Sequence, residues 1–379
     1  MTLPLTGIRV VEIAQNLAGP VAGEILGTLG ADVVKIERPE GDDARRWGPP
    51  FWNGTSPGFL AVNANKRSIT VDLKDRESVR WLTDFIGEAD ILVQNLRPGS
   101  LEELGLGAHA LIARYPRLIY CSVWGFGRFG PLKMRPAYEP IVQAFSGLMM
   151  MNGDDDTSPR RIGTSVLDFG TGTWTALGAL AALVRRAETG RGGVVDTSLL
   201  ETGLAWQKAH FASFRVSGQV PERHRTGAHR VVPFQGFETR TGPIIIAAGN
   251  DRLFVKLAGV LGHPGWPADE RFATNAARVT NAPALLAAIG EILLTRSKGE
   301  WIDLLEAAGV PCAPINTLPL AVSEPQAVAS GMIQAVPGDD YELMGLPIAF
   351  DGVRPPIRLA PPRAGEHNAE ILGPQKGEP

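Results

Sequence analysis

The sequence predicts an α/β fold whose main part is a doubly wound, Rossmann-like parallel sheet, accompanied by a smaller α/β domain. Two observations carry this prediction. Short β-branched segments alternate with helix-like segments over the first third of the chain, and 379 residues are enough for two domains or for one large domain with an insertion. The expected strands are bounded by polar turns and lie at 7–13, 32–36, 68–73, 91–94 and 118–123.

The first βαβ unit contains an unusual helix. Pro20 suits the first turn of this helix, which is expected to run to about Leu29. Inside it, Gly19, Gly23 and Gly27 recur every fourth residue, so that one face is bare backbone. Each glycine lowers helix propensity by roughly 1 kcal/mol. We therefore expect another part of the chain to pack closely on this face.

The second half of the chain changes in composition. A run of small and apolar residues over 169–186 predicts a buried helix. Residues 217–229 are polar and basic without clear periodicity, which predicts a linker or a long loop. A second mixed segment follows, and its expected elements are a strand at 243–248 and helices at 251–261 and 282–293.

Composition and charge argue against several functions. The net charge is −3 and the pI about 6.1, so a polyanionic ligand must be bound by a local group of Arg and Lys, and no nucleic-acid partner is expected. No window of 18 apolar residues predicts a membrane span, and residues 1–7 lack the pattern of a signal peptide. Cys121, Cys312 and the six histidines show no metal-type spacing. We expect a cytoplasmic protein that binds neither metal nor membrane.

The residues at the ends of the expected strands indicate which kind of cofactor the protein could bind. Glu37 ends the second strand, where a nicotinamide-binding fold places a ribose-binding acid. However, the turn over 16–20 lacks Gly-x-Gly-x-x-Gly, so a pyrophosphate cannot approach it closely. Basic side chains near the strand ends favour some phosphorylated ligand, although each alone is more often a solvated surface charge. These basic residues are Arg38, Lys66, Arg67, Lys74 and Arg97.

Asp168 is a candidate nucleophile. It stands in an apolar context, and small residues and the predicted buried helix follow it. A carboxylate near a helix N-terminus can face an electrophile with backbone N–H groups nearby, as covalent catalysis by a carboxylate requires. The same position also suits an aspartate that caps the helix, which is the more common role. Local sequence leaves both interpretations open.

Several longer motifs occur together, in order, over essentially the whole chain. The most specific block joins Leu17-Ala18-Gly19-Pro20 to residues 29–37. Further blocks are Asn65-Lys66-Arg67-Ser68-Ile69, Asn95-Leu96-Arg97-Pro98-Gly99, Gly105-Leu106-Gly107, Thr189-Gly190-Arg191-Gly192 and Gly365-Glu366-His367. With these motifs the chain resembles the class III (CaiB/BaiF-type) CoA-transferases, the family of the formyl-CoA:oxalate and carnitine CoA-transferases.

This resemblance implies a reaction and a set of site residues. Asp168 falls on the family's catalytic aspartate, which takes CoA from an acyl-CoA and gives it to a small carboxylic acid through an aspartyl anhydride and an aspartyl-CoA thioester. Glu139 falls on a glutamate near the active site and is expected to orient the substrate or the aspartate. Coenzyme A is expected as part of the substrate, and the implied contacts are Leu17, Ala18, Arg38, Val71, Asp72, Leu73, Lys74, Asn95, Leu96 and Arg97.

The resemblance also implies an architecture. Two subunits would form a homodimer in which the chains thread through each other as linked rings. In each subunit a large CoA-binding α/β domain would comprise residues 1–205 and 330–379, and a small domain would comprise 230–329. Residues 206–229 would form the linker between them.

The chain departs from the formyl-CoA transferase pattern at three places. Leu17 replaces a glutamine, and Glu103 replaces a CoA-binding arginine. The stretch over 227–230 lacks the multi-glycine lid. Formate and oxalate are therefore not the expected substrates, and the donor and the acceptor stay open.

Two other functions stay open as well. The α-methylacyl-CoA racemases share the family's fold, but they need a histidine to remove the α-proton, and the corresponding stretch here reads Pro136-Ala137-Tyr138-Glu139. A non-enzymatic CoA-binding protein would not need a nucleophile, and the presence of Asp168 favours an enzyme.

Overall fold

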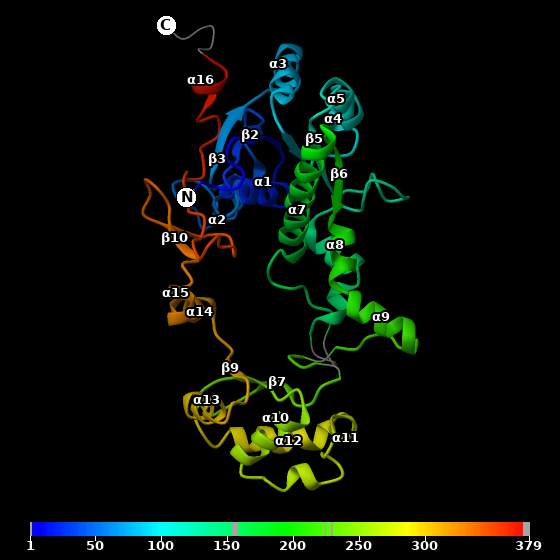
Figure 1. Ribbon diagram of the computed structural model, residues 1–379, viewed down its shortest axis with the longest axis vertical. Coiled ribbons are helices and arrows are strands. Elements are labelled where there is room, and N and C mark those ends of the chain that lie inside the picture. Colours follow the sequence, from blue (N-terminus) through cyan, green and yellow to red (C-terminus); the bar gives the residue numbers. More distant parts are fainter. Residues whose placement is uncertain (1, 154–157, 224, 229, 374–379) are drawn as a thin grey trace. The chain divides into compact units, whose positions relative to one another are not determined.

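The structure, a computed structural model, describes residues 2–153, 158–223, 225–228 and 230–373 (Figure 1). The chain divides into two compact units. Unit 1 comprises Met1–Leu148, Arg161–Ala212 and Pro325–Pro379, and unit 2 comprises Met149–Arg160 and Ser213–Glu324. Of the domains and the linker expected from the sequence, residues 1, 154–157, 224, 229 and 374–379 lie outside the described residues.

A six-stranded parallel sheet forms the centre of unit 1. Its strand order is β3-β2-β1-β4-β5-β6, and every neighbouring pair is parallel. The strands are β1 (Arg9–Ile13), β2 (Asp32–Glu37), β3 (Lys66–Thr70), β4 (Ile91–Gln94), β5 (Ile119–Trp124) and β6 (Gly193–Ser198). The predicted α/β fold with a central parallel sheet is confirmed.

Helices cover both faces of this sheet. α1 (Ala18–Thr28) and α7 (Val166–Thr189) pack on one face, while α3 (Arg76–Gly87) and α5 (Ala108–Arg114) contribute to the core on the other. Figure 1 shows α7 running alongside β5 and β6, and contacts between these elements agree. Successive strand residues serve opposite cores, since Val10 packs with α1 and α7 whereas Val11 packs with α3.

The helix α7 is long and apolar enough, by length and composition, to cross a membrane. Its buried alanines, Ala176, Ala179 and Ala182, pack in the core between α1 and the sheet. This packing accounts for the apolar composition of α7, which is therefore no argument for a membrane span.

The glycine face of α1 packs closely on the strands, as the sequence predicted. A Cβ on Gly23 would lie 1.8 Å from Oε2 of Glu12, and one on Gly27 would lie 2.7 Å from the carbonyl oxygen of Asn65. At Gly19 the neighbour is Ala14, whose Cβ would be 2.5 Å away. The bare backbone therefore makes room for a buried carboxylate under α1.

β3 lies at one edge of the sheet, and a segment near the C-terminus covers it. The N–H of His367 donates to the carbonyl oxygen of Ser68 (2.9 Å), and the N–H of Thr70 donates to Oδ1 of Asn368 (2.9 Å). Arg67 forms an ion pair with Glu370 (2.5 Å). Residues 365–370 therefore complete unit 1 next to its third strand.

The remaining elements of unit 1 are short. They are η1 (Asp43–Arg46), α2 (Pro57–Leu60), α4 (Ser100–Glu103), α6 (Glu139–Phe145), α8 (Leu199–Trp206), α15 (Pro325–Ala329), β10 (Ile333–Ala335), β11 (Glu342–Met344) and α16 (Asn368–Ile371). Two elements span a unit boundary, namely η2 (Leu148–Met151) and α9 (Lys208–Ser217). Because α9 is helical, the stretch expected as a linker over 206–229 is not a loop throughout.

Unit 2 has its own three-stranded antiparallel sheet and its own core. The strands are β7 (Phe234–Phe237), β8 (Ile244–Ala247) and β9 (Cys312–Pro314). The helices are α10 (Asp251–Val260), η3 (Trp266–Ala268), α11 (Asn275–Thr280), α12 (Ala282–Leu293), α13 (Lys298–Ala307) and α14 (Leu318–Ser323). The strand predicted at 243–248 and the helices predicted at 251–261 and 282–293 correspond to β8, α10 and α12.

Candidate active site

Asp168 lies in the first turn of α7. The residue that precedes this helix is Ser165, so Asp168 is inside the helix and is not its cap. Among the residues that the structure describes, no hydrogen-bond donor to the Asp168 carboxylate is found, and the side chain is half-buried. The alternative that Asp168 serves as an N-cap is therefore wrong.

A close approach of α7 to α1 places Asp168 beside the start of α1. Gly172 makes this approach possible, because a Cβ there would lie 2.6 Å from the carbonyl oxygen of Ala18. Asp168 precedes Gly172 by four residues, so both lie on the same face of α7. A cavity of about 120 Å³ is accordingly lined by Leu17, Ala18 and Asp168 together.

Glu139, the first residue of α6, is buried beside this cavity. Its Oε1 accepts hydrogen bonds from Nε2 of Gln143 (2.5 Å) and from the N–H of Leu167 (3.4 Å), the residue before Asp168. Its Oε2 lies 3.3 Å from a guanidinium nitrogen of Arg161. Glu139 thus holds the backbone next to Asp168, and its own charge is paired with Arg161.

The surroundings of Asp168 shift its proton affinity. Burial raises the pKa of Asp168 to about 7, the negative charge of Glu139 adds to the increase, and Arg161 opposes it. An ionised Asp168 is therefore poorly solvated and has no hydrogen-bond donor among the described residues. Such a carboxylate is a better nucleophile than one that is fully solvated or paired.

The turn that follows β1 also lines the cavity. Asn95, just after β4, clamps this turn, since its Oδ1 accepts from the N–H of Gln15 (2.9 Å) and its Nδ2 donates to the carbonyl oxygen of Gln15 (2.7 Å). β1 and β4 are the neighbours at which the strand order reverses, which is where doubly wound sheets bind ligands. Asn16, Asn95, Glu139 and Asp168 all line the cavity at this point.

The other predicted CoA contacts lie along the same edge of the sheet. A cavity of about 180 Å³ is lined by Arg38, Val71, Leu73 and Leu96, among others. A second, more open cavity of about 580 Å³ is lined by Leu73, Pro39 and five charged residues. Three of these are cations, Arg38, Arg46 and Lys74, and two are acids, Glu40 and Asp72. The structure thus gathers the predicted contacts into adjoining groups that share Arg38 and Leu73.

Some sequence-based expectations do not match this arrangement. Arg97, an expected CoA contact, is exposed and lines none of these three cavities. Lys66 and Arg67 are the first two residues of β3, whose other end faces the cavities. The Lys66 side chain is fully buried in an ion pair with Glu12, and Arg67 is paired with Asp32. The prediction that Lys66 and Arg67 meet a phosphorylated ligand at a strand end is therefore wrong.

Sequence reasoning missed four residues of the site. Gln143 and Arg161 both hold Glu139, Trp47 lines the cavity of Asp168, and Arg46 lines the open cavity with Arg38. A usable signal existed for Gln143, which follows Glu139 by four residues on one helix face. Within the described residues, no group of three or more His, Cys, Asp or Glu side chains is arranged for a metal ion.

The fold and the cavity together define an α/β protein that has a carboxylate of raised pKa, Asp168, at the switch point of its sheet. Residues 5–368 match the model of CoA-transferase family III. The chain belongs to this family and is a CoA-transferase, which confirms the resemblance seen in the sequence.

Relatives match over nearly the full chain. The mouse protein named succinyl-CoA:glutarate CoA-transferase is 35% identical over 373 residues, which cover 97% of this chain and 86% of the relative. The acetyl-CoA:oxalate CoA-transferase of Acetobacter aceti is 36% identical over 371 residues, which cover 97% of this chain and 95% of the relative. A CaiB/BaiF family crystal structure from Brucella suis has a TM-score of 0.89 and 37% identity, covering 98% of this chain and 99% of that one.

Proposed function

We propose that this enzyme moves CoA between dicarboxylic acids through covalent intermediates on Asp168. The observation that carries the proposal is the cavity in which Asp168, without a hydrogen-bond donor among the described residues, faces the start of α1 beside Leu17 and Ala18. The dicarboxylic substrates are inferred from the relatives, which are named for succinyl-CoA, glutarate and oxalate. Oxalate, which the sequence disfavoured, is thereby restored as a candidate acceptor.

The reaction would run in two balanced halves. The Asp168 carboxylate attacks the thioester carbonyl and expels CoA as a thiolate, leaving a mixed anhydride. The thiolate then attacks the aspartyl carbonyl, so that the donor acid leaves and an aspartyl-CoA thioester remains. The acceptor carboxylate repeats these steps in reverse, which yields its CoA ester and regenerates the Asp168 carboxylate without net proton transfer.

The start of α1 supports the charge that develops in these steps. Among the described residues no side chain caps this helix, and the positive end of its dipole borders the cavity at Leu17 and Ala18. Oxyanions and a thiolate formed at Asp168 would be stabilised there. Glu139 would act indirectly, because it holds the N–H of Leu167 and keeps the first turn of α7 in place.

The nucleotide end of CoA would lie along the edge of the sheet. Arg38 and Lys74 would meet its phosphates, and Arg46 is a further cation in the same cavity. Arg38 is already paired with Asp43 and hydrogen-bonded to the carbonyl oxygen of Gly41 (3.0 Å), so part of its charge is neutralised before CoA arrives. Arg97 is exposed and would contact CoA only at the surface.

We further propose a homodimer in the cytoplasm. Large apolar side chains are exposed on α6 and α8 of unit 1, and these are Ile141, Phe145, Leu204 and Trp206. A partner chain would cover them. The linked-ring arrangement remains a proposal based on the family. The cysteines, Cys121 and Cys312, are free, which suits a reducing compartment.

The racemase alternative has no support from the site. The described residues lining the Asp168 cavity include no histidine, and Ala137 and Tyr138 occupy the stretch where a racemase needs one.

A donor and acceptor screen tests the proposal. Succinyl-CoA and acetyl-CoA would be paired with glutarate, oxalate and malate, and the CoA esters formed would be read by mass spectrometry. We expect transfer to at least one dicarboxylate and, without acceptor, a CoA adduct on the peptide that contains Asp168. Deuterium entering the α-carbon of a 2-methylacyl-CoA in heavy water, without any transfer, would instead identify a racemase.

A further inference from the structure

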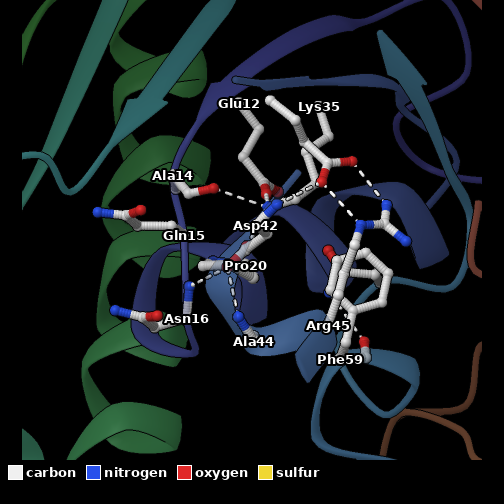
Figure 2. A network of polar contacts seen from close by, with 12 residues as sticks. Glu12, Ala14, Gln15, Asn16, Pro20, Lys35, Asp42, Ala44, Arg45 and Phe59 are labelled. Carbon is white, nitrogen blue, oxygen red and sulfur yellow. Dashed lines mark hydrogen bonds and ion pairs between the residues drawn. The ribbon is translucent and has the colours of Figure 1, made fainter. Parts of the chain in front are cut away.

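A cluster of buried charges lies under the start of α1, next to the cavity (Figure 2). Glu12 of β1 is its centre. Oε1 of Glu12 lies 3.0 Å from Nζ of Lys35, Oε2 lies 2.7 Å from Nζ of Lys66, and none of the three side chains is exposed. Although burial opposes ionisation, Lys66 and Lys35 together lower the pKa of Glu12.

The two lysines hold the two ends of the turn that lines the cavity. Nζ of Lys35 donates to the carbonyl oxygen of Ala14 (2.7 Å), just before the turn. Nζ of Lys66 donates to the carbonyl oxygen of Pro20 (2.8 Å), in the first turn of α1 that follows. The backbone over 15–19, which includes Leu17 and Ala18, is thus anchored on both sides to one buried carboxylate.

Asp42 adds a third anchor, in the middle of the turn. Its Oδ2 lies 3.0 Å from Nζ of Lys35, while its Oδ1 accepts from the N–H of Asn16 (3.1 Å) and of Ala44 (3.0 Å). Figure 2 shows Asp42 between Lys35 and Asn16. Asn16 has a left-handed backbone with φ of 66°, which an asparagine tolerates but does not prefer. The Asp42 carboxylate therefore helps to keep this turn in an uncommon conformation.

The buried charges of Glu12, Lys35, Lys66 and Asp42 fix the position of the backbone after β1 more than they stabilise the fold. A buried ion pair costs desolvation, and apolar residues of equal volume often stabilise a core as well or better. Apolar residues could not, however, accept a hydrogen bond from the N–H of Asn16 or donate hydrogen bonds to the carbonyl oxygens of Ala14 and Pro20. What the cluster supplies is a defined position for the turn.

We propose that Asp42 and Lys35 are positioning residues for CoA transfer, which hold the turn over 15–18 at the distance from Asp168 that the thioester requires. This inference rests on the proposed function of Asp168. Neither residue touches the reacting atoms. Both act through Asn16 and Ala14, so their loss should change the rate of the covalent step more than the affinity for CoA.

The test replaces Asp42 with asparagine. Asn has one acceptor oxygen, so it can serve either Lys35 or the two N–H groups, but not both. We expect Asp42→Asn to lower kcat for transfer from succinyl-CoA to glutarate by roughly 10- to 100-fold, while the Kd of CoA, measured by calorimetry, changes by less than about threefold. Amide hydrogen exchange in the peptide over 13–18 should become faster.

Asp90→Asn is the matched control. Asp90 precedes β4 at the opposite end of the sheet, where its Oδ2 accepts the N–H of Arg9 (2.9 Å) and its Oδ1 binds Arg186 (2.8 Å). It therefore combines an ion pair with a backbone hydrogen bond, as Asp42 does, but away from the cavity. We expect Asp90→Asn to lower the melting temperature and to leave kcat within about twofold of wild type.

A second variant keeps the inference testable where Asp42→Asn does not fold. Asn16→Gly accepts the left-handed backbone without strain and loosens the turn, so it should fold and still lower kcat. An unchanged kcat in Asn16→Gly, or a folded Asp42→Asn with wild-type kcat and exchange, would overturn the inference. Absence of transfer by the wild-type enzyme with every donor in the screen would instead contradict the proposed function.

Discussion

Two carboxylates of unit 1, the fully buried Glu12 and the half-buried Asp168, have pKa values that move in opposite directions. Glu12 has two lysine partners, and its pKa is lowered in spite of its burial. Asp168 has no hydrogen-bond donor among the described residues and lies near Glu139, and its pKa is raised to about 7. The comparison teaches that the charged partner, and not burial alone, decides whether the pKa of a carboxylate is lowered or raised.

The largest effect is expected where the unpaired carboxylate is removed. Asp168→Ala should fold and bind CoA but lose transfer by roughly three orders of magnitude or more, because no nucleophile remains. Steady-state kinetics and calorimetry with CoA measure the two effects. Asp75→Ala, which removes the exposed cap of α3, serves as the control and should keep full activity. Retention of more than about a tenth of the wild-type rate by Asp168→Ala would show that Asp168 forms no covalent intermediate.

The second-largest effect is expected on the free energy of unfolding, when Glu12, the carboxylate paired with two lysines, is replaced. Glu12→Gln leaves the buried Lys66 without its ion-pair partner, and we expect the free energy of unfolding to fall by about 3 kcal/mol. Urea denaturation measures this loss. In the control Glu88→Gln, the exposed pair with Arg9 is removed, and the change should stay below about 1 kcal/mol. Equal losses in the two variants would mean that the lysines beneath α1 do not depend on Glu12.

Arg38, a charged residue near the surface, is expected to affect the binding of the CoA ester. Arg38 is partly exposed and shares its charge with Asp43 and Glu40. We expect Arg38→Ala to raise the KM for the CoA ester roughly tenfold, or about 1.4 kcal/mol, with kcat nearly unchanged, because a phosphate contact is the same before and during reaction. A collapsed kcat with an unchanged KM would show that Arg38 acts at the reacting carbonyl.

The smallest effect is a shift in pH dependence. Asp168 must be ionised to attack, so kcat/KM should rise with pH and level off above about 7, the raised pKa of the free enzyme. Glu139→Gln removes a negative neighbour but keeps an acceptor for Leu167, so the midpoint should move down by about half a unit. Arg161→Gln should move the midpoint up. Midpoints that stay in place in both variants would exclude the assigned electrostatic coupling.

Local patterns were sufficient to predict the sheet and to point to several residues that line the cavities at its edge. Strand periodicity located β1, β2, β4 and β5, and the regular spacing of glycines revealed that α1 packs closely before its neighbours were known. Arg38 follows β2 and Lys74 follows β3, so both reach the ligand-binding edge of a parallel sheet. Their place could be derived from chain direction alone.

Chain direction also explains the errors. Lys66 and Arg67 are the first two residues of β3. The start of a parallel strand lies at the edge of the sheet opposite to the one where doubly wound folds bind their ligands. Arg161 could not be predicted, because its contact with Glu139 joins two segments that no periodic pattern relates. The role of Asp42 was equally hidden, since it depends on a hydrogen bond to a backbone N–H 26 residues away.

The segment over 365–370 that covers β3 has a consequence for biosynthesis. Thr70 and Asn368, which pair at this edge, are 298 residues apart. A nascent chain therefore exposes the outer edge of β3 on the ribosome long before its cover is made, and an unpaired edge is a template for association with other chains. Unit 1 can close this edge only after residue 368 has been translated, so chaperone binding during synthesis should concentrate on the β3 side of the sheet.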